Sequence, residues 1–229
     1  GHDKQFHDNL KEFVSNKKEN EEIFDGISSR HVNAYYSTIV KGLSAKVFRT
    51  YLASSVVSKN LRDHDNIKSE SDMKKLFHAK SANLDAAIMC NHKRTIPKNF
   101  EASLQKKKDT LKNVGKAKPW EKSEGLLKKA ESKITKTEKQ KEQQKEQIKK
   151  IKIVIRKRKA KHAERIEKLE LQINLTEKTR DYNLGTSLRN YIDPRIFKTW
   201  TDEVGAEWEK LYTSALQKKF LWVKSIDSK

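Results

Sequence analysis

The sequence lacks most of the features by which common protein classes are recognised. Only one of its 229 residues is a cysteine, Cys90, which excludes an internal disulfide framework and a cysteine zinc site. No run approaches the ~18 apolar residues of a membrane span, and the amino terminus has no signal-peptide apolar core. These absences predict a soluble intracellular protein. Because the chain starts at Gly1 rather than Met, we expect a fragment or a processed product.

Sequence motifs for nucleotide and hydrolytic chemistry are missing as well. The chain has no Gly-rich phosphate loop, no HExxH pair and no Ser-centred nucleophile elbow. The sequence therefore argues against a nucleotide-driven machine.

Acidic residues are scarce relative to basic ones. The 51 Lys and Arg residues outnumber 31 Asp and Glu residues, which gives a formal charge of +20. This excess indicates a polyanionic partner, either nucleic acid or an anionic membrane surface. Because 34% of residues are hydrophobic and 36% are charged, a core cannot be filled everywhere. Part of the chain must lie outside a globule, as an exposed helix or as disorder.

The first of three zones, residues 1–97, mixes apolar and polar residues in ordinary globular proportion. Apolar residues at three- and four-residue spacing predict a helix with one buried face. The residues of this face are Val32, Tyr36, Ile39, Val40 and Leu43. Gly42 interrupts the pattern, Ser44 is a suitable N-cap for a second helix, and a third helix is expected near residues 71–89.

The second zone, residues 98–180, carries most of the charge, with 27 Lys and Arg against 12 Asp and Glu. Its apolar stripe has the narrow width of a coiled-coil seam. The stripe consists of Leu104, Leu111, Val114, Leu127, Ile134, Ile148, Ile151, Ile155, Ile166, Leu169 and Ile173. It stops between Ile134 and Ile148, which predicts an antiparallel hairpin with arms of roughly 60 Å. Gly115 and Pro119 are expected to break the first arm, and one continuous helix is the competing interpretation.

The third zone, residues 181–229, returns to globular character and predicts further helices. Asp193 and Pro194 form a helix-start signal, and a short helix over residues 214–225 is expected to be capped by Thr213. The aromatic residues available for packing are Trp200, Trp208, Phe220 and Trp222. Since no strand pattern is convincing, the predicted fold class is all-α, a helical subdomain interrupted by a long antiparallel coiled-coil hairpin.

Arg49, His92 and Tyr191 are the candidates that remain for chemistry. From pattern alone each has a structural explanation. An arginine on an amphipathic helix is most often a solvated charge, a histidine after an apolar run is usually a cap or a core residue, and a tyrosine before a helix start usually packs. Composition and periodicity therefore assign no catalytic residue.

Three short segments together resemble the carboxy-terminal part of the eukaryotic-type type IB DNA topoisomerases. They are residues 45–51 (AKVFRTY), residues 90–94 (CNHKR) and residues 184–195, in which LGTS is followed by NYIDPR. The segments occur in the family's order, with a coiled-coil linker before the last one, and the resemblance covers nearly the whole chain. It implies three parts: a helical part of the catalytic core (1–97), a basic linker hairpin (98–180) and a carboxy-terminal domain with the nucleophilic tyrosine (181–229).

By this resemblance, Tyr191 is the nucleophile that attacks a DNA phosphodiester and becomes a 3′-phosphotyrosine. A phenol with a pKa near ~10 needs cations to attack at neutral pH. Arg49 corresponds to the arginine that clamps the phosphoryl oxygens, with Lys46 one turn earlier on the same face, and His92 to the histidine that donates to a non-bridging oxygen. In addition to Lys46, contacts to DNA next to the cleavage site are expected from Asn91, Thr186 and Asn190. Because the covalent intermediate conserves the energy of the broken bond, neither ATP nor a metal cofactor is expected.

Two departures from the family pattern bear on what the chain is. The family uses another arginine and a lysine general acid upstream of residues 45–51, and neither is found in a matching context in the first 40 positions. We therefore expect the carboxy-terminal portion of a larger enzyme, or one subunit of a split one, with the amino-terminal core and duplex DNA as partners and no membrane. Leu52 stands where the family typically has Asn, which indicates an archaeal or otherwise divergent member. The expected location is with DNA, in the nucleus of a eukaryote or the cytoplasm and nucleoid of an archaeon.

Two alternatives to a topoisomerase stay open at this point. A non-catalytic coiled-coil nucleic-acid-binding or scaffold protein would account for the charge, but not for the surroundings of Tyr191. A tyrosine recombinase shares the nucleophile, although the long linker before the tyrosine argues against it. Within the linker, residues 149–161 hold eight Lys and Arg in thirteen positions and no acid. This run is either a solvated coiled-coil face or a patch that faces DNA downstream of the cut, and a nuclear-localisation signal is a weaker third interpretation.

Overall fold

The computed structural model describes residues 2–62 and 65–225, and within these ranges the chain is helical without a β-strand. In chain order the α-helices are α1 (His2–Val14), α2 (Ser29–Ile39), α3 (Ala45–Arg62), α4 (Asp72–Met89), α5 (Phe100–Lys116), α6 (Glu121–Glu131), α7 (Glu138–Lys178), α8 (Leu184–Asn190), α9 (Pro194–Val204) and α10 (Ser214–Lys219). Short 3-10 segments are η1 (Asp65–Ser69), η2 (Trp208–Leu211) and η3 (Leu221–Ser225). The predicted all-α class is confirmed.

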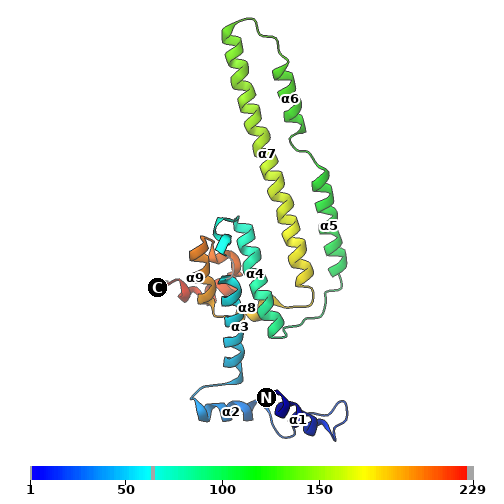
Figure 1. Ribbon diagram of the computed structural model, residues 1–229, viewed down its shortest axis with the longest axis vertical. Helices are drawn as coiled ribbons and strands as arrows, with labels where there is room; N and C mark the ends of the chain where they lie inside the picture. The colour runs from blue at the N-terminus through cyan, green and yellow to red at the C-terminus, as the bar shows by residue number, and fades with distance from the viewer. Residues whose placement is uncertain (1, 63–64, 226–229) are drawn as a thin grey trace.

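A helical body gathers α3, α4, α8 and α9 with the short carboxy-terminal helices (Figure 1). Its core brings together residues that are far apart in the sequence, including Val57 of α3, Ala86 of α4, and Phe197 and Trp200 of α9. The predicted start of α9 is confirmed, because the Asp193 carboxylate accepts a hydrogen bond from the Arg195 N–H at 2.9 Å. Segments on either side of the hairpin therefore form one core.

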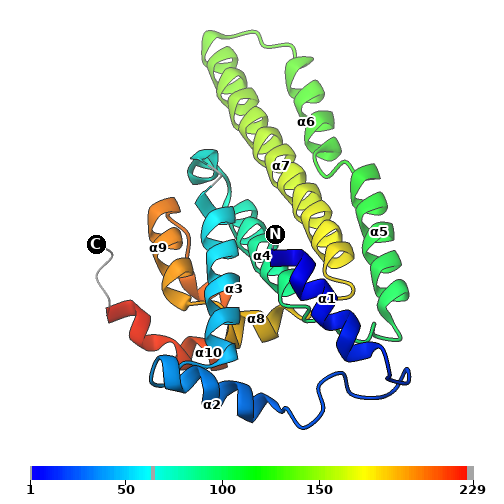
Figure 2. The ribbon, with the colours of Figure 1, turned by 60° about the horizontal axis from the view of Figure 1, so that its bottom comes forward.

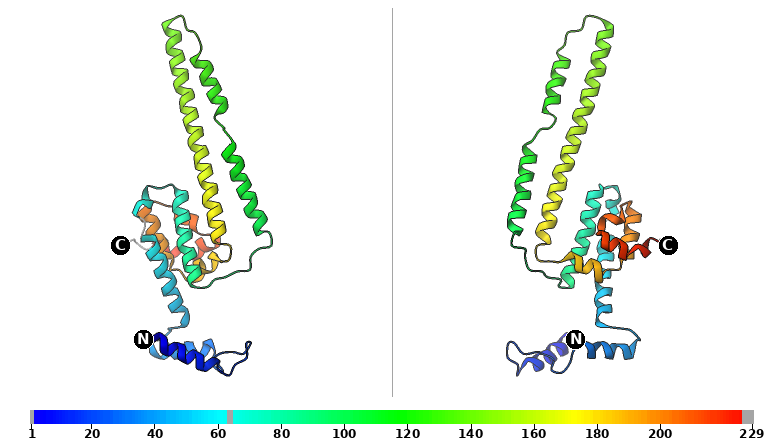
Figure 3. Two further views of the ribbon diagram at one scale, coloured as in Figure 1. Left: turned by 45° about the vertical axis from the view of Figure 1, so that its right-hand side comes forward. Right: turned by 180° about the vertical axis from the view of Figure 1, so that it is seen from behind.

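The hairpin rises from this body as two antiparallel arms, α5 followed by α6 on one side and α7 on the other (Figure 3). The alternative of one continuous helix is wrong. The first arm breaks between Lys116 and Glu121, as Gly115 and Pro119 predicted. At its base the hairpin rests against α4, where the Lys74 ammonium pairs with Glu167 of α7 at 3.0 Å.

The seam between the arms follows most of the predicted stripe. Leu104, Val114, Ile155 and Ile173 are buried. Ile134 is an exception, because it lies in the loop between α6 and α7 and is 89% exposed. Ala130 and Ser123 of α6 are buried against α7 instead, and small residues at these positions let the helices approach closely.

The break in the first arm is held by side chains of α7. Nε2 of His162 lies 2.9 Å from the Val114 carbonyl oxygen near the end of α5. The Arg158 guanidinium donates to the Pro119 carbonyl at 3.3 Å and to the Ser123 hydroxyl at 2.8 Å. These contacts satisfy backbone groups that the interruption leaves without helical partners.

Helix α2 does not have the buried face that the spacing of its apolar residues predicted. No residue of α2 is buried, and Tyr35 and Ile39 are 65% and 61% exposed. The reason is position: α1, α2 and the amino-terminal half of α3 extend away from the body on the side opposite the hairpin (Figure 1). Helix α1 was not predicted at all.

The carboxy-terminal helix expected over residues 214–225 is split. Helix α10 ends at Lys219 and the chain continues as η3, while the Thr213 side chain makes no capping hydrogen bond. Trp200, Trp208 and Phe220 are buried as expected, but Trp222 is 49% exposed. Within the described ranges, no helix is both long and apolar enough to cross a membrane.

Candidate active site

Helix α3 presents two basic side chains near its amino-terminal end. Lys46 and Arg49 are three residues apart, so they lie on the same face of the helix. The Arg49 guanidinium donates a hydrogen bond to the Cys90 carbonyl oxygen at the end of α4. That contact aims the side chain toward the turn in which His92 lies.

His92 is positioned by a tight end to α4. Asn91 follows the helix with φ 52°, a left-handed conformation that asparagine tolerates better than most residues. The N–H groups of Asn91 and His92 then donate back to the carbonyls of Ile88 and Ala87, both at 2.9 Å. This pair of bonds is a Schellman motif, and it places His92 two residues beyond the C-cap, Cys90.

The two chain segments at the base of the hairpin pair with each other. The Asn183 N–H donates to the His92 carbonyl at 2.8 Å, and the Arg94 N–H donates to the Asp181 carbonyl at 3.0 Å. The Arg94 guanidinium also donates to two backbone carbonyls just after α7, both at 3.1 Å. Residues on either side of the 98–180 hairpin are thereby brought together, and α8 packs against α4 (Figure 2).

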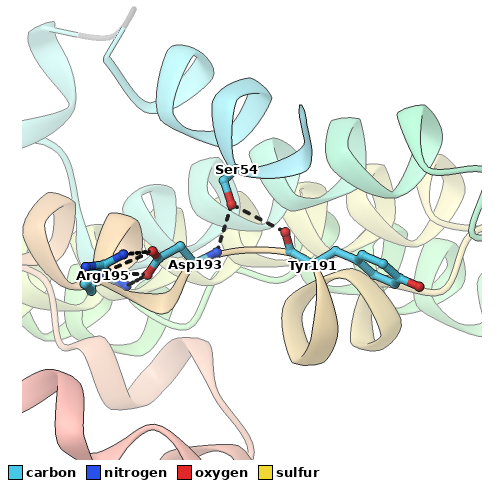
Figure 4. Close-up of polar contacts among 4 residues, drawn as sticks. All are labelled: Ser54, Tyr191, Asp193 and Arg195. Atoms are coloured by element: carbon cyan, nitrogen blue, oxygen red, sulfur yellow. Dashed lines mark hydrogen bonds and ion pairs between the residues drawn. The ribbon is translucent and has the colours of Figure 1, made fainter. Parts of the chain in front are cut away.

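Tyr191 lies at the end of the short helix α8. Asn183 caps the start of that helix, since its side-chain oxygen accepts from the N–H groups of Gly185 at 3.0 Å and Thr186 at 3.3 Å. Tyr191 is the C-cap residue, and its N–H donates to the Ser187 carbonyl at 2.9 Å. Figure 4 shows the Tyr191 ring extending away from the helix end, with the hydroxyl at its far tip.

Three of the side chains predicted from the sequence lie against the ring of a fourth, Tyr191. The ring centroids of His92 and Tyr191 are 4.9 Å apart, with 36° between their planes. The Arg49 guanidinium carbon lies 5.1 Å from the centroid of the Tyr191 ring, and the Lys46 ammonium lies 5.8 Å from it. Two cations and an imidazole therefore surround one phenol.

The imidazole of His92 is in an unusual electrostatic setting. Burial, and then the positive charge of Arg49, lower the pKa of His92 from its ordinary value. Both of its ring nitrogens are buried without a hydrogen-bond partner in the part of the chain that the structure describes. A buried polar group without a partner is costly, and the lowered pKa keeps this imidazole neutral, with one N–H donor and one acceptor nitrogen.

The three residues expected to contact DNA lie around this cluster rather than in it. Asn91 and Asn190 are exposed neighbours of His92 and Tyr191, and Thr186 is partly buried in the first turn of α8. No group of three or more His, Cys, Asp or Glu side chains within residues 2–62 and 65–225 is arranged to hold a metal ion.

Sequence reasoning missed three residues that build the site. Asn183 caps α8, and its place just before that helix is a signal that could have identified it. Arg94 ties the hairpin base, which nothing in the local pattern indicates. Ser54 of α3 hydrogen-bonds the backbone around Tyr191, and only the packed structure shows it.

Comparison with known proteins shows which family the chain resembles over most of its length. Residues 2–126 match the family model described as "Eukaryotic DNA topoisomerase I, catalytic core", and residues 163–229 match the "C-terminal topoisomerase domain". DNA topoisomerase 1 of Rattus norvegicus is 35% identical over 229 residues, covering 96% of this chain and 28% of the relative. The human enzyme is also 35% identical, over 226 residues with the same two shares.

DNA topoisomerase 1 of Drosophila melanogaster is 31% identical over 220 residues, which is 96% of this chain and 20% of the relative. The chain thus spans about a quarter of the length of the curated relatives it matches. These relatives are animal enzymes, so they lend no support to the archaeal lineage that Leu52 indicated. The first family model alone covers more than half of the chain, and the chain belongs to the eukaryotic DNA topoisomerase I family.

Proposed function

We propose that this chain is the carboxy-terminal catalytic portion of a type IB DNA topoisomerase. One observation carries the proposal: the Tyr191 ring is surrounded by Arg49, Lys46 and an imidazole whose two nitrogens are buried without partners. The non-bridging oxygens of a phosphodiester would pair with the two cations and accept a hydrogen bond from the N–H of the neutral imidazole.

The proposed reaction is a transesterification. The Tyr191 hydroxyl oxygen loses its proton and attacks a backbone phosphorus of one DNA strand. The bond from phosphorus to the 5′ oxygen breaks, and that oxygen takes up a proton and leaves as a 5′-hydroxyl. Arg49 and Lys46 stabilise the phenolate and the charge that grows on the phosphoryl oxygens, and neutral His92 donates one N–H to a non-bridging oxygen.

Relaxation of supercoils follows from the bond that is kept. The 3′-phosphotyrosine holds one broken end while the free 5′ end rotates about the intact strand. Religation is the reverse attack of the 5′-hydroxyl, so the bond energy is conserved and the cycle consumes no ATP. We place the reaction in the nucleus, where a eukaryotic enzyme of this family meets duplex DNA.

The remainder of the enzyme is the second partner that we propose. The family's upstream arginine and lysine general acid lie outside the matched motifs of this chain, and the chain spans 28% of the rat and human enzymes. We therefore propose that an amino-terminal core, in the same polypeptide or a separate subunit, completes the site. The three domains keep the boundaries proposed from the sequence, with the nucleophile in residues 181–229.

Trapping the covalent intermediate tests the function. The chain, completed with its amino-terminal core, is incubated with a labelled duplex whose cleaved end diffuses away, and protein-linked DNA is counted on a denaturing gel. Tyr191→Phe should abolish the adduct and leave DNA affinity within about twofold, because the phenol oxygen is the atom that reacts. Tyr182→Phe, a nearby tyrosine at the hairpin base, is the matched control and should form the adduct normally.

Two results would contradict the proposal. An adduct that persists in Tyr191→Phe would show that another residue is the nucleophile. A completed wild-type enzyme that binds DNA but forms no adduct would favour the non-catalytic coiled-coil alternative. Membership of the topoisomerase I family argues against the tyrosine recombinase.

A further inference from the structure

Ser54 occupies a place between the helix that carries Arg49 and the turn that carries Tyr191. Its hydroxyl oxygen accepts a hydrogen bond from the Asp193 N–H at 3.0 Å. The same hydroxyl donates to the Tyr191 carbonyl oxygen at 3.4 Å. Figure 4 shows both contacts converging on Ser54 from the two sides of residue 192. One hydroxyl can donate once and accept as well, so Ser54 fits both roles at the same time.

The far side of this turn is anchored independently. The Asp193 carboxylate caps α9 and also pairs with the Arg195 guanidinium, whose Nε lies 3.0 Å and 2.9 Å from its two oxygens. Burial alone would raise the pKa of Asp193, but the hydrogen bonds from Arg195 outweigh it and hold the pKa below its ordinary value. The Ile192 side chain is buried in the core. Beyond Tyr191, therefore, the backbone is held against α9 and the core.

The near side of the turn is the end of α8. The N–H groups of Tyr191 and Ile192 both donate to the Ser187 carbonyl, at 2.9 Å and 3.1 Å. These bonds fix the turn relative to α8, but they do not fix it relative to α3. Ser54 makes that second connection, five residues after Arg49 on the same helix.

We propose that Ser54 is a positioning residue for the transesterification: it holds the Tyr191 backbone at a fixed distance from Arg49. This inference rests on the proposed function. The hydroxyl contacts only backbone atoms and none of the groups that would touch a phosphate. Its effect is on how often the phenol oxygen and the Arg49-bound phosphoryl group are aligned, and reaction rates are sensitive to misplacements of about 1 Å.

The expected signature is a loss of rate without a loss of binding. Ser54→Ala should slow adduct formation at saturating DNA by about tenfold, which corresponds to about 1.4 kcal/mol in the barrier. DNA affinity should stay within about twofold, because Ser54 is not among the groups proposed to bind DNA. Ser54→Thr keeps the hydroxyl and should restore the rate to within about threefold of wild type.

The matched control is Ser55→Ala, the next residue of α3, which is exposed. The completed enzyme is compared in all four forms by single-turnover adduct formation, DNA titration and thermal unfolding. The proposal is overturned if Ser54→Ala reacts at the wild-type rate, if Ser55→Ala is slowed equally, or if the loss appears in DNA affinity instead of rate. It is also overturned if Ser54→Thr is folded but as slow as Ser54→Ala. Failure of the wild-type enzyme to form any adduct would instead contradict the proposed function.

Discussion

At the scale of single residues, the site depends on backbone contacts more than on contacts between its functional side chains. Arg49 is oriented by the Cys90 carbonyl, and Tyr191 by the Ser187 carbonyl and the Ser54 hydroxyl. The His92 ring is placed by the hydrogen bonds that end α4. The polar groups that face Tyr191 are thus oriented mainly by backbone contacts, as the proposed transesterification would require of a preorganised site.

The low pKa of His92 predicts a loss of stability in mild acid. Burial and the charge of Arg49 lower that pKa in the folded chain, so the unfolded chain takes up a proton first as the pH falls below about 6.5. Stability is complete above that ordinary value and is lost as the pH falls through the window down to the lowered pKa. His92→Asn should therefore reduce the drop in Tm between about pH 7.5 and about pH 5.5.

The control for this prediction is His7→Asn, because His7 lies exposed on α1. It should leave the wild-type difference in Tm unchanged. If the drop in Tm is as large in His92→Asn as in wild type, His92 does not titrate with folding.

At the scale of elements, the hairpin uses only part of its positive charge for its own structure. Within residues 149–161, Lys150, Lys152 and Lys159 pair with glutamates, and Arg158 holds the break between α5 and α6. Other cations of α7, among them Lys149 and Arg156, line a shallow hollow with Lys145 and Lys152. Lys149 and Arg156 are seven residues apart, so they share one face of the helix.

The face with Lys149 and Arg156 is where we expect the linker to touch DNA. Replacing both by Gln should reduce the slope of log affinity against log salt concentration by about 1.8, since each phosphate contact contributes ~0.9. The matched control replaces Lys141 and Lys150, which pair with Glu138 and Glu146 of their own helix, and should change the slope much less. Equal changes in the two variants would show that the linker acts only through its net charge.

The break in the hairpin gives a stability prediction. Arg158→Ala removes the donor to the Pro119 carbonyl and the Ser123 hydroxyl, and Ser123 is buried. Leaving the buried Ser123 hydroxyl without this partner costs about 1–3 kcal/mol. Relative to wild type, amide hydrogen exchange in the variant should therefore become faster in α6 than it does in α5. Arg156→Ala, on the exposed face, is the control. Unchanged exchange in α6 would mean that Arg158 is not what holds the break.

How far the sequence predicts these elements depends on whether a signal is local. The sequence predicted α4 near residues 71–89, and the gap after Ile134 predicted that the chain turns back, although the loop covers residues 132–137 and most of the gap belongs to α7. Ile134 itself was misplaced in the seam, because periodicity does not show where the last helical turn ends. The motifs named Arg49, His92 and Tyr191. Ser54 was not identified from the sequence, because it is five residues after Arg49 and so ~140° around the helix from it. Its contacts form only when the turn after α8 packs on α3.

At the scale of the whole molecule, one end of the chain has more apolar surface than a finished protein normally leaves in water. Tyr35, Ile39 and Val40 on and after α2, and Phe48 and Tyr51 on α3, are between 46% and 69% exposed. Exposed apolar side chains concentrated on two neighbouring helices favour an interaction site there. The surface lies beside Lys46 and Arg49, where the proposed amino-terminal core would have to bring its arginine and lysine.

This surface predicts how the chain and its core associate. Tyr35→Ser with Ile39→Ser should weaken binding of the chain to the separately produced core by about 100-fold, because each exposed apolar side chain contributes about 1.5 kcal/mol or more when buried. Leu126→Ser with Ile134→Ser removes two apolar side chains that are 57% and 89% exposed on the hairpin, and should leave binding unchanged. A titration by calorimetry distinguishes the pairs, and equal weakening would place the interface elsewhere.

Activity is expected only from the associated form. The chain alone should fail to relax supercoiled plasmid, since the family's general acid and second arginine are not among its matched motifs. Adding the core should restore relaxation. Efficient relaxation by the chain alone would show that its own residues, rather than an upstream segment, complete the site.

The hairpin also has a mechanical consequence for the site. Helix α7 has 41 residues and is therefore about 60 Å long, while its base lies against α4 at the usual separation of packed helices, about 10 Å. A tilt of about 10° at its base would therefore move the tip by about 10 Å. Because α4 ends in the turn that holds His92, a movement of α7 that also shifted α4 would displace the imidazole.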